Sequence, residues 1–190
     1  MAFDWIEIVG ACTGITYLIL EIRQNMWLWP VGLLNALFYA VIFFSGGLYA
    51  IMSLQLYYVA MMIYGWWNWM HGVSDSEAEQ IPISHASGKI WLLIILAGLI
   101  LWVAISFLLY YLTDSKVPVW DGMTTAFSIV GTWMLAKKYI EQWFVWIFVN
   151  IFSVCLYASQ NLKITAVLYG VYAVMAVVGY FEWKKTICQE

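Results

Sequence analysis

Seven apolar runs dominate this sequence of 190 residues, of which 65% are hydrophobic and only 10% charged. Each run approaches the roughly 20 residues that a helix needs to cross the hydrocarbon core of a bilayer. The runs do not alternate polar and apolar residues, as the strands of a membrane barrel would. We therefore predict an all-α membrane protein with seven transmembrane helices, over residues 3–22, 27–45, 48–69, 90–112, 120–136, 142–160 and 164–183.

The sequence also contains an internal repeat. Four residues of one segment recur 114 positions later: Tyr58, Met61, Gly65 and Trp69 match Tyr172, Met175, Gly179 and Trp183. A shift of 115 places Trp5 on Trp120 and Asn35 on Asn150. We predict two parallel three-helix repeats, residues 1–70 and 118–190, joined by a linker helix over 90–112. Parallel repeats in transporters place the solute site at their interface near the membrane midplane.

The distribution of lysine and arginine predicts the orientation, because these residues concentrate in cytoplasmic loops. Six lie on one side and two on the other: Arg23, Lys89, Lys137, Lys138, Lys184 and Lys185 against Lys116 and Lys163. The N-terminus is therefore predicted outside and the C-terminus in the cytoplasm. The acidic loop over 71–89, with Asp75, Glu77 and Glu79, is predicted cytoplasmic as well.

Several function classes do not fit the composition. A net charge of −3 offers no basic surface for nucleic acid. Three scattered cysteines, Cys12, Cys155 and Cys188, have no metal-binding spacing and are predicted to be small buried apolar residues. An intramembrane enzyme needs a buried nucleophile and base or a metal cluster, and none is evident, so we expect no enzyme, metal or cofactor.

The expected mode of transport is passive. Coupling to protons or sodium usually relies on ionisable groups inside the membrane, and the acidic residues of the predicted helices lie near helix ends. A non-transporting seven-helix receptor or sensor is the alternative. A retinal pigment would need a lysine inside the last helix, which Lys163 and Lys184 only bracket.

The predicted helix over 142–160 carries the most informative stripe of side chains. Steps of three and four residues place one set on the same face: Trp143, Trp146, Asn150, Ser153 and Tyr157. An amide without partners in an apolar environment costs roughly 2–7 kcal/mol. Asn150 therefore either bonds a neighbouring helix, a contact worth about 0.6 kcal/mol on average, or helps to form a polar solute site.

Two further helices add candidates for that site. Asn35 and Tyr39 share a face of the helix over 27–45, and Gln55 and Tyr58 share a face of the helix over 48–69. Three amides under aromatic cover favour the solute-site interpretation. The neighbouring tryptophans at positions 66, 67 and 69 are predicted to belong to the interfacial belt instead. Since indole faces attract cations by roughly 2 kcal/mol when water is excluded, the expected solute is an amphiphilic ring carrying delocalised positive charge.

Four motifs together make the chain similar to the PnuC family of nicotinamide riboside transporters: Trp143-x-x-Trp146-x-x-x-Asn150, Trp120-Asp121, Ile63-Tyr64-Gly65-Trp66 and Gly32-Leu33-Leu34-Asn35. The resemblance implies a 3+1+3 fold like that of the SWEET proteins and facilitated diffusion (uniport) across the bacterial inner membrane. It also implies intracellular phosphorylation of the vitamin by a cytoplasmic kinase, and a homo-oligomer among membrane lipids. Thiamine, which some relatives are thought to carry, is the alternative substrate.

Overall fold

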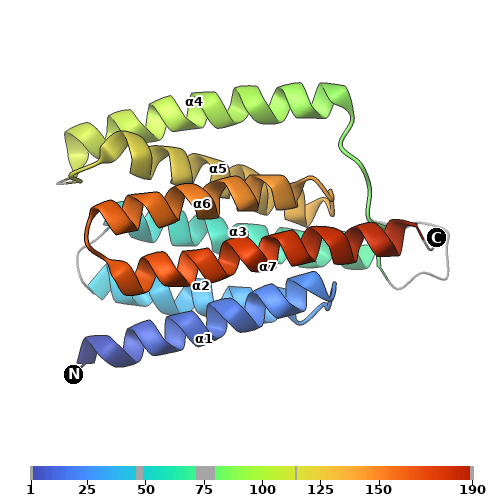
Figure 1. Cartoon of the computed structure of the whole chain (residues 1–190), viewed down its shortest axis with the longest axis horizontal. Coiled ribbons are helices and arrows are strands. Elements are labelled where there is room, and N and C mark those ends of the chain that lie inside the picture. Colours follow the sequence, from blue (N-terminus) through green and yellow to red (C-terminus); the bar gives the residue numbers. More distant parts are fainter. Residues whose placement is uncertain (1, 46–48, 72–79, 114, 189–190) are drawn as a thin grey trace. The chain divides into compact units, whose positions relative to one another are not determined.

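The computed structural model describes residues 2–45, 49–71, 80–113 and 115–188. All seven predicted helices are present in it (Figure 1), with these bounds: α1 Ala2–Ile22, α2 Leu28–Ser45, α3 Tyr49–His71, α4 Gly88–Leu112, α5 Pro118–Ala136, α6 Gln142–Ser159 and α7 Lys163–Ile187. The largest difference is at the end of α7, which continues to Ile187 rather than stopping at 183. The predicted all-α class is confirmed.

Local sequence signals explain where some helices begin. The Ser87 hydroxyl accepts a hydrogen bond from the backbone N–H of Ile90 and caps the N-terminus of α4. Pro118 opens α5, a position where its missing N–H leaves no hydrogen bond unmade. These caps hold the helix ends near the predicted limits of the apolar runs.

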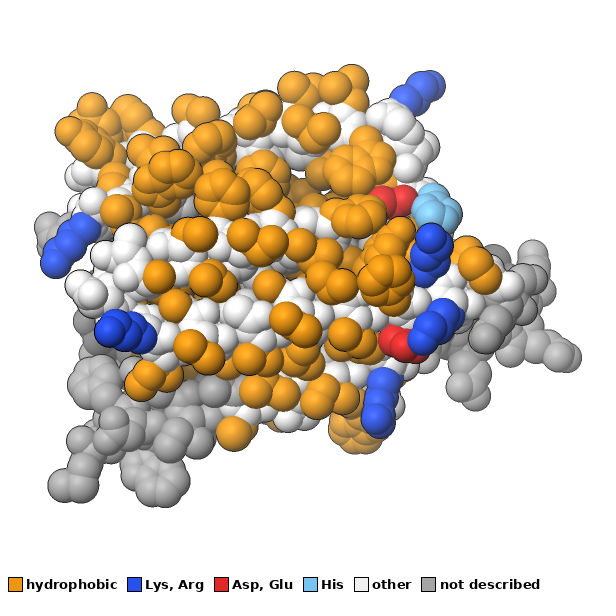
Figure 2. All heavy atoms as spheres, viewed as in Figure 1, with side chains coloured by type: hydrophobic (Ala, Val, Ile, Leu, Met, Phe, Trp, Pro, Cys, Tyr) orange, Lys and Arg blue, Asp and Glu red, His pale blue; other side chains and the backbone are white. Residues whose placement is uncertain are grey.

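The apolar surface of the helices fits a bilayer. Within the described residues, α4, α6 and α7 are each long and apolar enough to cross a membrane on their own, and shorter apolar stretches cover Cys12–Ile22 and Leu28–Ile42. Hydrophobic side chains cover the middle of α4, α6 and α7 on the face shown in Figure 2, and charged ones lie near their ends. This pattern places lipid, rather than water, around the helices.

The chain divides into two compact units. The first comprises Met1–Pro82 with the short segment Ala136–Lys138, and the second comprises Ile83–Leu135 with Tyr139–Glu190. The linker helix α4 is thus grouped with α5, α6 and α7. Residues 72–79 of the acidic loop predicted over 71–89, including Asp75, Glu77 and Glu79, lie outside the described residues.

The predicted repeat recurs in the turns that follow α1 and α5. Gln24 and Lys138, 114 residues apart, both adopt left-handed backbone conformations, with φ of 53° and 58°. The next residue then bonds back five positions. The Asn25 N–H donates to Leu20 O at 2.9 Å, and the Tyr139 N–H donates to Met134 O at 3.1 Å. This backbone geometry closes a helix end and usually uses glycine.

The helix pairs α2–α3 and α6–α7 are packed in the same way. Trp29 of α2 lies against Gly65 of α3, where a Cβ atom would overlap the indole ring, and Trp143 of α6 lies against Gly179 of α7 in the same manner. Each indole also meets a second indole edge to face, since Trp29 and Trp69 have ring centroids 5.2 Å apart. The repeat thus conserves a slot in which glycine admits a tryptophan.

This packing corrects one prediction. Trp69 was predicted to belong to the interfacial belt, but it is fully buried, because its ring packs edge to face on Trp29. Trp67, two positions earlier, is 59% exposed and fits the belt interpretation. In the second unit Trp143 and Trp183 repeat the pair, with centroids 5.5 Å apart.

α4 approaches α5 closely through a small residue. A Cβ atom at Gly122 would stand 2.9 Å from the backbone nitrogen of Ser106, and the Trp102 indole donates to Val119 O at 2.8 Å. Apart from this contact, most of α4 is exposed. Only 11% of the residues in its most apolar stretch are buried. α4 therefore has the lipid-facing character expected of a linker helix.

Candidate functional site

The predicted stripe on α6 lies in the second unit and is buried between neighbouring helices. Trp143, Asn150 and Ser153 are buried, and Trp146 and Tyr157 are half-buried. The opposite face of α6 carries exposed Phe148 and Ile151. α6 therefore turns its polar stripe inward and its apolar face outward, as a helix lining a solute route would.

Trp146 combines an accessible ring with a buried polar atom. Its ring lies over Gly131 of α5, where an added Cβ atom would stand 3.2 Å from the indole. Its indole nitrogen is buried and has no hydrogen-bond partner within the described residues. Since buried polar groups are nearly always paired, this N–H is a candidate donor to a bound solute.

Asn150 lies one turn beyond Trp146 and is 5% exposed. Its carboxamide offers two donors and two acceptor lone pairs. Ser153, 3% exposed, adds a hydroxyl on the same face. These groups could hold an uncharged polar substituent such as a hydroxyl or an amide.

Trp143 has a different environment from Trp146. It is fully buried, with its ring against Gly179 and Trp183. Trp29 occupies the equivalent slot in the first unit, and the indole nitrogens of Trp29 and Trp143 both lack a partner in the described part of the chain. The repeated geometry favours a packing role for Trp143, so the candidate site narrows to the part of the stripe from Trp146 onward.

Tyr157 ends the stripe in an aromatic cluster. Its ring lies 5.1 Å from that of Tyr169 on α7, which in turn lies 5.7 Å from that of Tyr172. Tyr169 is not among the predicted site residues, and Tyr172 entered only as part of the predicted repeat. The signal was available, because Tyr58, a predicted site residue, is the repeat counterpart of Tyr172.

The other predicted residues lie in the first unit. The Asn35 carboxamide donates to Thr13 Oγ1 of α1 at 2.7 Å, so this amide does bond a neighbouring helix. Asn35 and Tyr39 also line a groove of about 820 Å³ with Thr13 and Thr16. Asn35 therefore lies at the groove with its amide nitrogen already bonded to α1.

Gln55 and Tyr58 lie on α3 and are half-buried. The Tyr58 ring packs 5.6 Å from that of Tyr57. The register of α3 against α2 is fixed nearby, because a Cβ atom at Gly32 would stand 2.6 Å from the sulfur of Met62. Since the two units are described separately, the convergence of the first-unit amides with Asn150 stays a prediction.

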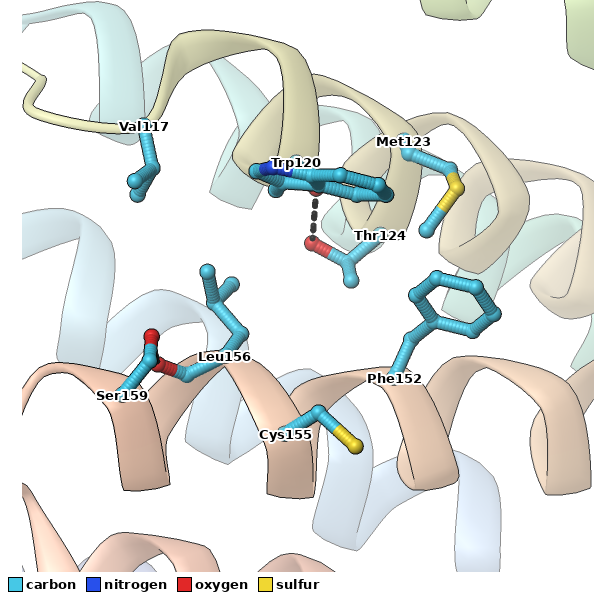
Figure 3. Close-up of a pocket in the computed structure, with 8 residues that line it drawn as sticks. All are labelled: Val117, Trp120, Met123, Thr124, Phe152, Cys155, Leu156 and Ser159. Atoms are coloured by element: carbon cyan, nitrogen blue, oxygen red, sulfur yellow. Dashed lines mark hydrogen bonds between the residues drawn. The ribbon is translucent and has the colours of Figure 1, made fainter.

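A smaller cavity of about 230 Å³ lies between the start of α5 and the end of α6 in the second unit (Figure 3). Trp120 and Phe152 face each other across it, with ring centroids 6.0 Å apart. Phe152 follows Asn150 by two residues, which at roughly 100° per residue places it nearly opposite on the helix. This cavity is therefore separate from the polar stripe.

Cys155 lines the same cavity and corrects another prediction. Cys12, Cys155 and Cys188 were predicted to be buried, but all three are exposed. Burial cannot be predicted from apolar character in this chain, because lipid solvates apolar side chains on the outer surface. Within the described residues, no group of three or more histidine, cysteine or acidic side chains could hold a metal ion.

Comparisons with known proteins bear on the family and the fold. The family described as nicotinamide mononucleotide transporter matches residues 4–185. The chain is 28% identical to the nicotinamide riboside transporter PnuC of Escherichia coli (strain K12), over 95% of this chain and 85% of that one. It is 26% identical to the riboflavin/roseoflavin transporter RibM of Streptomyces davaonensis, over 94% of this chain and 84% of that one.

A solved structure is similar throughout. The crystal structure of the vitamin B3 transporter PnuC superposes with a TM-score of 0.75 at 28% identity and covers 98% of this chain and 83% of that one. The similarity therefore extends over all seven helices rather than over one repeat.

Proposed function

We propose, from the premise that this chain belongs to the nicotinamide mononucleotide transporter family, that it carries nicotinamide riboside across the bacterial inner membrane by facilitated diffusion. Membership makes the chain a multi-pass membrane transporter of a vitamin and not an enzyme. The alternative of a seven-helix receptor is thereby set aside. Phosphorylation by a cytoplasmic kinase would trap the vitamin and keep the inward gradient.

The observation that carries this proposal is the buried indole N–H of Trp146, which has no partner among the described residues, one helical turn from the buried amide of Asn150. Nicotinamide riboside joins a cationic pyridinium ring to a carboxamide and a ribose. The indole face attracts the ring, and the indole N–H donates to an oxygen of the vitamin. Asn150 and Ser153 then bond its amide or hydroxyl groups, with Tyr157 closing the aromatic side.

Four residues of the first unit stay predicted vitamin contacts, and their part in the proposal follows from the sequence prediction. Asn35 accepts through its carboxamide oxygen while its N–H stays bonded to Thr13. Gln55, Tyr39 and Tyr58 are the further predicted polar and aromatic contacts of that unit. Trp143 acts through packing, because its ring fills the slot at Gly179.

Two other vitamins are the competing substrates. Thiamine is also a flat cation, so it satisfies the same indole contacts. The similarity to RibM makes riboflavin a candidate. Its ring is uncharged, however, so an indole face attracts it less strongly than a cationic ring. Charge on the ring is therefore the property that separates the candidates.

The test is a calorimetric titration of the purified protein with nicotinamide riboside, thiamine and riboflavin, followed by uptake into proteoliposomes. We expect nicotinamide riboside to bind at least tenfold more tightly than the others, about 1.4 kcal/mol. Tighter binding and faster uptake of thiamine or riboflavin would reassign the substrate. Binding of none of the three would reject the proposed substrate and both alternatives.

A further inference from the structure

Lys138 is a buried cation that the proposed transport route does not use. It lies in the turn between α5 and α6 and is only 3% exposed. Its ammonium donates to Ile81 O at 2.8 Å and to Gln80 Oε1 at 3.3 Å. The same nitrogen stands 4.5 Å from the centroid of the Trp69 ring. Burying a lysine is costly unless such partners replace its water, so these contacts hold the ammonium in one place.

The backbone of Lys138 is equally constrained. Its left-handed conformation, with φ of 58°, is unfavourable for a residue with a side chain and persists where surrounding contacts enforce it. A second contact fastens the same turn, because the Asn68 carboxamide donates to Ala136 O at 2.9 Å. α3 thus holds the turn through both Asn68 and Trp69.

The position of this turn in the chain gives the contacts their significance. Ala136–Lys138 packs with the first unit, whereas Leu135 before it and Tyr139 after it belong to the second. The turn that joins α5 to α6 is therefore in contact with α3 through Asn68 and Trp69. The equivalent left-handed residue of the other repeat is Gln24, which carries no charge.

We propose that Lys138 is a positioning residue for transport, whose buried ammonium fixes the turn between α5 and α6 on Trp69 as a joint. With the joint fixed, α5 and α6 move as a rigid arm that carries Trp146 and Asn150. Without the ammonium the turn becomes more mobile, and translocation of the vitamin slows although the residues that contact the vitamin are unchanged. The inference rests on the proposed function for its transport assay, but not for its structural test.

The structural test is hydrogen exchange measured by mass spectrometry, which requires no substrate. Lys138→Met keeps an apolar stem and removes the ammonium, and Lys138→Arg keeps a cation. The matched control is Lys137→Met, at the neighbouring lysine, which is half-buried over the Tyr64 ring. We expect amide exchange over residues 136–140 to rise about tenfold in Lys138→Met, as the loss of a desolvated cation–π contact allows, and to stay unchanged in Lys137→Met.

The functional test separates rate from affinity in proteoliposomes. The uptake rate is divided by the amount of protein that binds the vitamin. On that scale, Lys138→Met should lower the maximal rate about tenfold and leave the dissociation constant within about twofold of the wild-type value. Lys138→Arg should restore the rate. A wild-type rate in Lys138→Met, or a loss of affinity that accounts for the slower uptake, would overturn the proposal.

Three further outcomes are also decisive. If Lys138→Met does not fold, Asn68→Leu is used instead, because it removes the hydrogen bond from α3 to Ala136 O. Its amide exchange and its uptake rate are then measured in the same way. If the wild type carries another vitamin, the proposed substrate fails and the rate test is repeated with that vitamin. If the wild type carries none, unchanged exchange in the variant would still reject the joint.

Discussion

Trp146 illustrates how one polar atom can indicate a solute site. A buried donor without a partner costs about 1–3 kcal/mol, and its indole nitrogen is in that state in the described part of the chain. Trp143, one turn earlier, has the same unpaired atom but a different surrounding, because its ring is enclosed by Gly179 and Trp183. The pair therefore provides a test and its control on one helix.

Replacing Trp146 by phenylalanine should weaken vitamin binding about tenfold, close to 1.4 kcal/mol, because the ring face stays and the N–H donor is lost. Trp143→Phe should leave the affinity unchanged and lower only the melting temperature. Both are measured by calorimetry and thermal unfolding in detergent. Equal vitamin affinities in Trp146→Phe and Trp143→Phe would show that the Trp146 N–H does not bind the vitamin.

Asn150→Leu removes the carboxamide at nearly constant volume. We expect binding to fall at least tenfold, or 1.4 kcal/mol, while the protein still inserts and folds. Phe152→Leu, on the opposite face of α6, is the control and should bind normally. Intact binding by Asn150→Leu would show that the amide serves only packing.

Side-chain types and their shared face could be predicted from the sequence, but their partners could not. The stripe of Trp146, Asn150 and Ser153 follows from helical periodicity. The Asn35 bond to Thr13 depends on how α1 meets α2, which periodicity does not contain. The buried state of Lys138 was missed for a related reason, because a charge at a helix end is expected to reach water.

The helix pairs α2–α3 and α6–α7 depend on two glycines that admit an indole. At Gly65 the ring of Trp29, and at Gly179 the ring of Trp143, fills the space of a Cβ atom. Overpacking of this kind typically costs 1–3 kcal/mol. The two helix pairs should therefore respond alike to the same substitution.

Gly179→Ala should destabilise the protein by about 1–3 kcal/mol, because the added methyl group forces Trp143 out of its slot. The matched control is Gly170→Ala on the same helix, where the nearest atom to an added Cβ is 4.0 Å away. Thermal unfolding of both variants in detergent tests this. A normal melting temperature for Gly179→Ala would show that the slot is not tightly packed.

Helix limits could be predicted closely because apolar runs and helix lengths must both match the bilayer. The turns could not. Glycine normally signals a left-handed residue at a helix end, whereas this chain uses Gln24 and Lys138 there. The 114-residue repeat seen in α3 and α7 also relates Gln24 to Lys138. Applying it to the turns would have shown that these two residues are equivalent.

At the scale of the whole molecule, the two sequence repeats carry the same left-handed residue after a helix and the same indole slot within one chain. This duplication supports the family's transporter fold, in which repeats move relative to each other around a central solute. The orientation of the chain and its oligomeric state stay predictions. Both the energy source and the orientation can be tested directly.

Uptake of nicotinamide riboside into proteoliposomes should stop when the inside and outside concentrations are equal. We expect no more than about a twofold effect from an imposed proton or sodium gradient, since coupling usually needs ionisable groups within the membrane. Trapping enzyme added inside is the positive control. Accumulation above the outside concentration without trapping would contradict uniport.

The positive-inside distribution predicts a cytoplasmic C-terminus. A green fluorescent protein fused after Glu190 should fluoresce in bacteria, and alkaline phosphatase fused there should be inactive. The reverse result would invert the orientation of the whole chain.

The exposed thiols give the molecule its own reporters of motion. Cys12 belongs to the first unit, and Cys155 and Cys188 belong to the second. In Cys188→Ser, one native thiol remains on each unit, and neither is in the polar stripe of α6. Spin labels on these two positions would record the change in their separation as the vitamin binds, with no cysteine introduced anywhere in the chain.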